Sequence, residues 1–341
     1  MRCVIKSRNR ALALLQAQAC KAFSFIDTFI KYLRMKLLTS EKLDQDIDQE
    51  LVQHMEKTVG LKYLNKTKNQ SSHPLYLFIN QATNKKCILK RLNKTDSEIK
   101  VYLEYLPLIK SSFNTLVLPE AVAAFHFGES ICLLLPYYEG EHFSHNTNNL
   151  KLADDLVEIV LDLSTIDVAL IPKDKSAFNY NAFESHFWNN FDKAHALGMV
   201  AVDDLEQIKA QCAEVLARGG KNQIMVVSNG DFNPRNVIRL PDGKLVLLDW
   251  NGSFVYPLEH MLAYPWLLNW ENPAWQKEYA SKFEGKLPVD QARLKMHLMN
   301  AALFKAVDEK KHGNRYADKM SADHLKKFYA SFSGFQSLTE L

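Results

Sequence analysis

The spacing of apolar residues changes along the chain, and this change limits the folds that the chain can adopt. Between about residues 61 and 92, apolar and polar residues alternate in three short segments, LKYLNKT, PLYLFIN and KKCILKRL. Alternation with a period of two is typical of half-buried β-strands. Beyond Gly140 the pattern is mostly helical, beginning with KLADDLVEIVLDL. This order predicts an α+β fold with two lobes, a small strand-rich lobe and then a larger helical one.

One helix and two more strands complete the predicted N-terminal lobe. The helix, DSEIKVYLEYLPLI, should end at Pro107 or shortly after it, and the strands lie around AVAAFHFG and SICLLLPYY. We expect a basic extension over residues 1–40, an N-terminal lobe over 41–138 and a C-terminal lobe over 139–341. An acidic amphipathic helix is expected at 41–58.

The net charge of +3 is distributed unevenly. Residues 1–36 carry eight Lys or Arg and a single Asp, a net charge of +7, which leaves −4 for the rest of the chain. Nucleic-acid binding depends on an excess of cations that meets the phosphates, so we expect no nucleic-acid partner.

The N-terminal segment from Leu12 to Leu33 has apolar residues at helical spacing. Three interpretations remain open: a transit peptide, a helix on a membrane surface, or residues upstream of a true start at Met35. No stretch of the sequence approaches the roughly 20 apolar residues that span a bilayer. The five cysteines are widely spaced and contain no C-x-x-C pair, which is typical of a reducing compartment and favours a cytoplasmic location.

The segment MVVSNGDFNPRNVIRLPDGKLVLLDWNGS carries the most chemical information. Two β-prone runs, VIRL and LVLL, flank the turn sequence PDGK, which predicts a hairpin. If Leu240 pairs with Leu245, Asn236 lies opposite Asp249. Opposed residues in an antiparallel ladder have Cβ atoms about 5 Å apart. Amide and carboxylate oxygens brought together in this way are the hard ligands that Mg²⁺ binds.

Asp231 precedes Asn236 by five residues, in a Gly-Asp-Phe-Asn-Pro loop. A short loop could return its carboxylate to the side of the metal, where it would suit a base that deprotonates an attacking hydroxyl. Phosphoryl transfer requires mainly positioning and charge neutralisation, which these residues could supply. A surface hairpin with polar ends would explain any one of these residues, but it explains the full set poorly.

This set resembles the catalytic core of the aminoglycoside phosphotransferase and choline kinase-like superfamily, small-molecule kinases of protein-kinase-like fold. Their loop commonly reads His-Gly-Asp-x-x-x-x-Asn. The resemblance covers roughly residues 55–300 and is strongest over 227–250. It implies that Asp231 is the catalytic base, that Asn236 and Asp249 bind Mg²⁺, and that ATP is the second cofactor.

The resemblance also assigns roles in the predicted N-terminal lobe. Lys90 would contact the α- and β-phosphates, whereas a surface lysine is the alternative. Glu98 would be the partner of Lys90, since SEIKVYLEYLP resembles a Glu-x-x-x-Tyr…Leu-Pro helix of the family. Glu104 is the rival partner. A capping box in the sequence TDSE would also explain Glu98 without any catalysis.

The strand and linker ICLLLPYYEGEHF resemble the connection between the two lobes, where the backbone hydrogen-bonds adenine. Pro136 has no N–H, which leaves Tyr137 and Tyr138 as the sources of the adenine-facing amide. A buried strand and turn is the alternative.

Three features depart from the family pattern. Asn229 stands where the family usually has His, the expected phosphate-covering turn over 65–73 contains no glycine, and PLEHMLA replaces a common Asp-Leu-Ala. A nucleotide-binding pseudokinase that serves as an interaction module is therefore the alternative to an active enzyme. A protein kinase is disfavoured because LDWNG stands in place of Asp-Phe-Gly.

The expected reaction is transfer of the γ-phosphoryl group of ATP to a hydroxyl of a small-molecule acceptor. Four tryptophans and two glutamates gather where the acceptor would bind: Trp250, Trp266, Trp270, Trp275, Glu259 and Glu271. Aromatic faces with a carboxylate could hold a cationic amine or amino alcohol. The alternative is that the tryptophans belong to the core. The sequence fixes neither the acceptor nor the oligomeric state.

Overall fold

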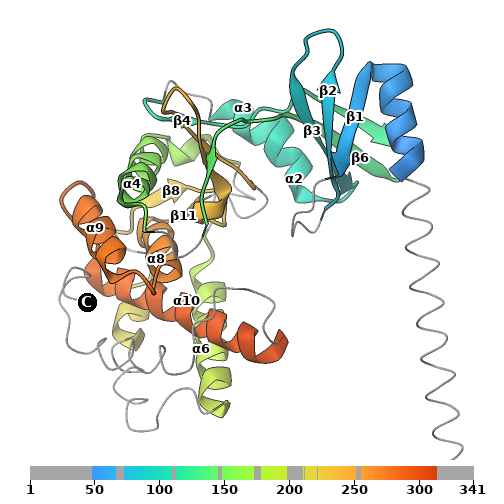
Figure 1. The fold of residues 1–341 in the computed structure, drawn as a ribbon. Coiled ribbons are helices and arrows are strands. Elements are labelled where there is room, and N and C mark those ends of the chain that lie inside the picture. The colour runs from blue at the N-terminus through green and yellow to red at the C-terminus, as the bar shows by residue number, and fades with distance from the viewer. Residues whose placement is uncertain are drawn as a thin grey trace, which may run out of the picture. The chain divides into compact units, whose positions relative to one another are not determined.

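The computed structural model divides into two compact units, Met1–Cys87 and Ile88–Leu341 (Figure 1). The structure describes residues 48–66, 73–109, 113–144, 148–172, 178–197, 210, 212–220, 222–250 and 255–312. The predicted basic extension over residues 1–40 lies outside these residues. No helix among them is long and apolar enough to cross a membrane.

The first unit consists of a helix packed against antiparallel strands. Residues 48–54 are α-helical and continue into the π-helix η1 (Met55–Val59), so the described part of the predicted acidic helix is confirmed. Gly60 then ends the helix at φ 71°, a left-handed conformation that glycine adopts without steric cost. The strands are β1 (Leu61–Lys66) and β2 (Leu75–Asn80), which pair antiparallel.

Strand β3 (Lys86–Asn93) begins in the first unit and continues into the second. In the first unit the strand order is β1-β2-β3, and in the second it is β3-β6-β5. Strands β5 (Ala123–Phe127) and β6 (Ser130–Pro136) form an antiparallel hairpin. All five strands lie within the predicted segments to within one residue.

The predicted helix after β3 is present but irregular. It consists of α2 (Ser97–Lys100), the π-helical η2 (Val101–Tyr105) and α3 (Leu106–Leu108). Its end just beyond Pro107 agrees with the prediction. Two short strands of the second unit follow in the chain, β4 (Leu116–Val117) and β7 (Glu141–His142).

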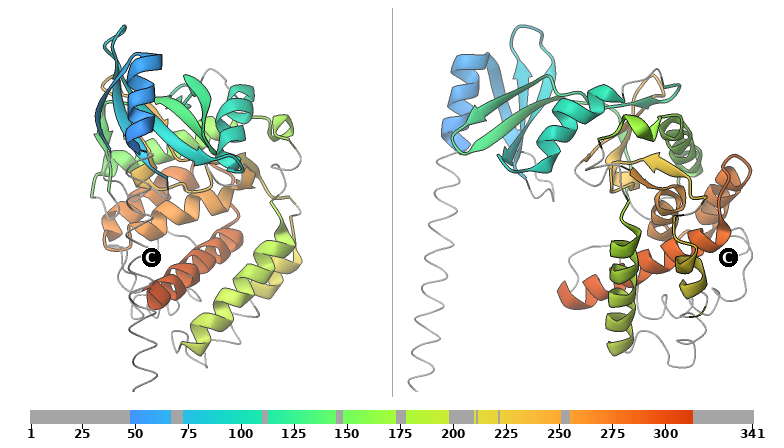
Figure 2. Two further views of the ribbon diagram at one scale, coloured as in Figure 1. Left: turned by 90° about the vertical axis from the view of Figure 1, so that its right-hand side faces the viewer. Right: turned by 180° about the vertical axis from the view of Figure 1, so that it is seen from behind.

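The remainder of the second unit is mostly helical, as predicted. Its elements are α4 (Leu150–Ser164), η3 (Val168–Leu170), α6 (Tyr180–Ala196), β8 (Met225–Val227), η4 (Pro234–Asn236), β9 (Val237–Arg239), β10 (Leu245–Leu247), β11 (Val255–Pro257), α8 (Leu258–Leu268), α9 (Pro273–Glu284) and α10 (Gln291–His312). Figures 1 and 2 show α4 beside α9, and α10 beside both α8 and α6. In α4, Leu152, Leu156, Ile159 and Leu163 recur on one face and are fully buried, which makes this helix part of the core.

The hairpin β9–β10 forms where it was predicted, but its register differs by one residue. Leu245 pairs with Arg239 and not with Leu240. The turn has three residues instead of four, because Gly243 adopts φ 86° and the N–H of Leu240 donates to the carbonyl of Lys244. Asn236 therefore lies level with Leu248, whose N–H donates to the Asn236 carbonyl at 2.7 Å. The prediction that Asn236 faces Asp249 across the ladder is wrong.

Candidate active site

The loop that follows β8 brings Asp231 and Asn236 together. Gly230 has φ 81°, and its N–H donates to the Ser228 hydroxyl, which turns the chain immediately before Asp231. The Asn236 side chain then reaches back across the loop. Its Nδ2 donates to Asp231 Oδ2 at 3.1 Å and to the Asp231 carbonyl at 2.9 Å.

Asp249 lies directly after the hairpin, and the charge of its carboxylate affects the pKa of Asp231. The pKa of Asp231 is raised, first because the carboxyl is partly buried and then because the Asp249 charge repels its ionised form. Asp249 Oδ1 also lies 3.8 Å from the Lys90 ammonium. Two neighbouring carboxylates with an adjacent amide form an oxygen-rich site of the kind that a divalent cation stabilises. The structure thus gathers the three residues that the motif singled out, although by a different register.

Lys90 and Glu98 form a buried ion pair. Lys90 Nζ lies 2.5 Å from Glu98 Oε1, and the two residues are only 6% and 0% exposed. Burial raises the pKa of Glu98, while the Lys90 ammonium opposes this change. The alternative that Lys90 is a surface lysine is therefore wrong. Glu104 is exposed and is not the partner.

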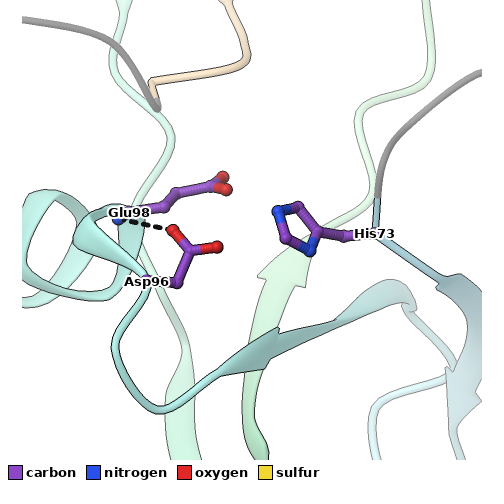
Figure 3. Close-up of side chains that lie close together, drawn as sticks. All are labelled: His73, Asp96 and Glu98. Atoms are coloured by element: carbon purple, nitrogen blue, oxygen red, sulfur yellow. Dashed lines mark hydrogen bonds between the residues drawn. The ribbon is translucent and has the colours of Figure 1, made fainter.

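The capping-box alternative for Glu98 also differs from the structure. Asp96 is the residue that caps α2, and its carboxylate accepts a hydrogen bond from the backbone N–H of Glu98 at 2.9 Å (Figure 3). The Glu98 side chain accepts from Lys90. The cap thus fixes the backbone of Glu98 and leaves its carboxylate to the ion pair.

Asn229 connects the Asp231 loop to the segment that carries Asp249. Its Nδ2 donates to the Asp231 carbonyl at 3.0 Å and to the Leu248 carbonyl at 2.8 Å. The residue is 1% exposed, so neither bond competes with bulk water. An amide at this position can therefore hold the loop where the family pattern has His.

A cavity of about 570 Å³ extends from Asp231 into the helical part of the second unit. Its wall is rich in aromatic residues and comes from α6, β11, α8, α10, the segment before α6 and the loop that follows β8. The Phe and Tyr residues among them are Phe178, Phe183, Phe232, Tyr256, Tyr264 and Phe304. Local sequence patterns did not predict this cavity, because its wall is assembled from segments far apart in the chain.

The tryptophans near the catalytic segment do not line this cavity. Trp250, Trp266 and Trp275 are between 1% and 4% exposed and belong to the core, and Trp270 packs against the core. Glu259 is buried and accepts from the backbone N–H of Asp290. The interpretation of this group as the acceptor wall is wrong, and the alternative that the tryptophans are core residues is confirmed.

Tyr137 and Tyr138 follow β6 directly and are both partly buried. Burial raises the pKa of Tyr138 to about 12, and the Glu120 carboxylate adds to this effect. An adenine contact at their backbone stays a prediction. Most of the glycine-free turn, residues 67–72, lies outside the described residues.

Comparison with known proteins gives a consistent result. The model of a sequence family described as the phosphotransferase enzyme family (APH) matches residues 71–297. A thermostable mutant of aminoglycoside phosphotransferase APH(4)-Ia in its apo form aligns with a TM-score of 0.59 at 14% identity, over 83% of this chain and 100% of that chain. A ternary complex of such a mutant with AMP-PNP and hygromycin B gives 0.60 at 12% identity, over 84% and 99%.

Choline kinase LicA from Streptococcus pneumoniae gives a TM-score of 0.52 at 17% identity, over 84% of this chain and 100% of that chain. No match was found among curated proteins. These structural similarities confirm the predicted kinase-like α+β fold.

Proposed function

Since the chain belongs to the phosphotransferase enzyme family, we propose that it transfers the γ-phosphoryl group of ATP to a hydroxyl group of a small molecule. The observation that carries this proposal is the position of Asp231. Its carboxylate is held by Asn236, lies next to that of Asp249, and also lines the aromatic cavity. A phosphate donor and an alcohol could therefore meet at one carboxylate.

Asp231 acts as the base in this proposal. Partial burial and the neighbouring Asp249 raise its pKa, which makes the carboxylate a better proton acceptor for the acceptor hydroxyl. Asn229 and Asn236 both donate to the Asp231 carbonyl, so the backbone that carries the base is held from two sides. Positioning of this kind lowers the barrier because the reacting groups are already aligned.

Asn236 and Asp249 would hold Mg²⁺. The donor set fits, because it combines a carboxylate and an amide oxygen, and a divalent cation would relieve the repulsion between Asp231 and Asp249. When bound, Mg²⁺ neutralises the charge that develops on the phosphate oxygens.

Lys90 would bind the nucleotide phosphates, and Glu98 would orient it. Their buried ion pair supports this assignment, since each charge is otherwise costly to bury. Adenine would bind at the backbone of Tyr137 and Tyr138. We assign residues 41–138 to the nucleotide lobe and 139–341 to the acceptor lobe. The cysteine pattern favours a cytoplasmic location.

A transfer assay tests the proposal. The purified full chain is incubated with Mg²⁺ and γ-labelled ATP against amino alcohols, sugars, aromatic alcohols and a protein substrate. Asp231→Asn should abolish transfer while Mg-ATP binding, measured by calorimetry, is retained. Asp242→Asn is the control, because Asp242 lies in the exposed hairpin turn.

Two outcomes would contradict the proposal. Mg-ATP binding without transfer to any acceptor would indicate a nucleotide-binding module, as in a pseudokinase. The absence of any Mg-ATP-dependent thermal shift in the wild-type protein would exclude nucleotide-dependent chemistry altogether.

A further inference from the structure

The cavity beside Asp231 has a wall that suits flat, apolar ligands. Phe183 lies on α6, Tyr256 on β11 and Phe304 on α10, so aromatic rings approach from three separate elements. The volume of about 570 Å³ falls within the range of about 300–1,000 Å³ that is typical of sites for drug-sized molecules. A ligand with one or two rings can be accommodated in such a space.

The charges around the cavity do not favour a cation. Asp231 is the one acidic residue among the described lining residues, and none of them is Lys or Arg. Burial also lowers the pKa of His260 to about 4, so this lining residue is uncharged at neutral pH. The one lining carboxylate is that of Asp231, which serves as the base, so no second acidic residue of the described lining is left to pair with a cation.

One buried polar atom in the lining lacks a partner. Asn300 lies on α10, lines the cavity and is 8% exposed. Its Oδ1 accepts no hydrogen bond within the described part of the chain. Buried polar groups almost always have a partner, so this oxygen indicates where a hydrogen-bond donor of a ligand would lie.

We propose that the acceptor is an uncharged aromatic alcohol that carries a second hydrogen-bond donor. Its rings pack against Phe183, Tyr256 and Phe304, the second donor meets Asn300 Oδ1, and the reacting hydroxyl faces Asp231. The hydroxyl oxygen forms a bond to the γ-phosphorus of ATP, the bond from that phosphorus to the bridging oxygen breaks, and ADP leaves with the electron pair. The hydroxyl proton passes to Asp231. This inference rests on the proposed phosphotransferase function.

The test measures binding of three probes to the full chain by calorimetry, without nucleotide. The first is a neutral naphthalene that carries a hydroxyethyl group on one ring and a hydroxyl on the other. In the second probe a trimethylammonium group replaces the ring hydroxyl, and in the third that hydroxyl is absent. We expect the first probe to bind at least about tenfold more tightly than the cationic probe.

Two variants assign the contacts. Phe304→Ala should weaken binding of all three probes, whereas Leu103→Ala should not. The two side chains are matched in exposure, at 46% and 44%, so both proteins should remain folded. Asn300→Leu should weaken the first probe about fivefold or more, without weakening the probe that lacks the ring hydroxyl. Thermal unfolding of each variant verifies that it is folded.

The outcomes separate this inference from the proposed function. Tighter binding of the cationic probe, or affinities unchanged by both Phe304→Ala and Asn300→Leu, would overturn the inference. So would phosphorylation of cationic acceptors with no transfer to the neutral probe, although the phosphotransferase function would then stand. The expected binding pattern without transfer from Mg-ATP would support the ligand class and refute the phosphotransferase function.

Discussion

Replacement of Asn229 by leucine tests whether this residue holds the catalytic loop in position. Leucine is similar in size to asparagine but donates no hydrogen bond. The change therefore removes the donor from the Leu248 carbonyl and one of two side-chain donors from the Asp231 carbonyl, which keeps its bond from Asn236. The Oδ1 atom that is also lost has no partner in the described structure, so its removal costs little.

The magnitude follows from these contacts. A buried carbonyl that loses its partner costs about 1–3 kcal/mol. For domains of 150–250 residues, each kcal/mol lowers the melting temperature by about 2–4 °C. We therefore expect Asn229→Leu to lower the melting temperature by about 2–12 °C. We also expect it to reduce ADP formation with Mg-ATP by about tenfold or more, because the Asp231 carbonyl loses one of its two side-chain donors.

Asn269→Leu provides the matched control. Asn269 is 0% exposed and its Nδ2 donates to the Pro265 carbonyl at 3.1 Å, so it is an equally buried asparagine that donates to a carbonyl within α8. Both variants should lose stability, but only Asn229→Leu should lose turnover when assayed well below its melting temperature. Equal turnover of the two variants would refute the positioning role of Asn229.

Three further predictions concern buried charges. Lys90→Met leaves Glu98 buried without its partner and should lower the free energy of unfolding by about 3–5 kcal/mol. The double variant Lys90→Met, Glu98→Leu should regain most of this stability but should not regain Mg-ATP affinity. Between pH 6.5 and 4 His260 becomes protonated in the unfolded chain but not in the folded chain, so the free energy of unfolding falls by at most about 3 kcal/mol as the pH drops. His260→Gln should reduce this pH dependence, whereas His126→Gln, at an exposed site, should not. Burial raises the pKa of Glu259, so the ionisation of this carboxyl lowers the free energy of unfolding as the pH rises through that pKa. Glu259→Gln should therefore unfold at a higher temperature than the wild type at pH 8, but not at pH 4.

The sequence predicted elements whose signals are local. The alternation around Lys90 gave the right strand, and the spacing of Asp231, Asn236 and Asp249 gave the right group of polar residues. The partner of Lys90 was also predicted correctly, through the resemblance of SEIKVYLEYLP to the Glu-x-x-x-Tyr…Leu-Pro helix of the family. In each of these cases a few neighbouring residues contain enough information.

Features that depend on packing were not predictable in the same way. The concentration of tryptophans near Asp249 suggested a binding wall, but Trp275 stacks on Tyr279 at 5.0 Å and donates from Nε1 to the Asn149 carbonyl. This hydrogen bond joins α9 to a residue more than a hundred positions earlier. The aromatic cavity was missed for the same reason, since Phe183 and Phe304 line one cavity only because α6 and α10 pack together.

The predicted register of the hairpin was wrong, yet Asp249 still lies close to Asp231 and Lys90. In a regular strand, a shift of one residue would move Asp249 to the opposite face of the sheet. Asp249 instead adopts φ 59°, a left-handed value that Asp tolerates better than most residues with a Cβ atom. This conformation breaks the strand alternation at the position where the Asp249 carboxylate comes close enough to raise the pKa of Asp231. The Asp249 carboxylate thus approaches Asp231 in spite of the shifted register, and the role of Asp249 as a metal ligand stays a prediction.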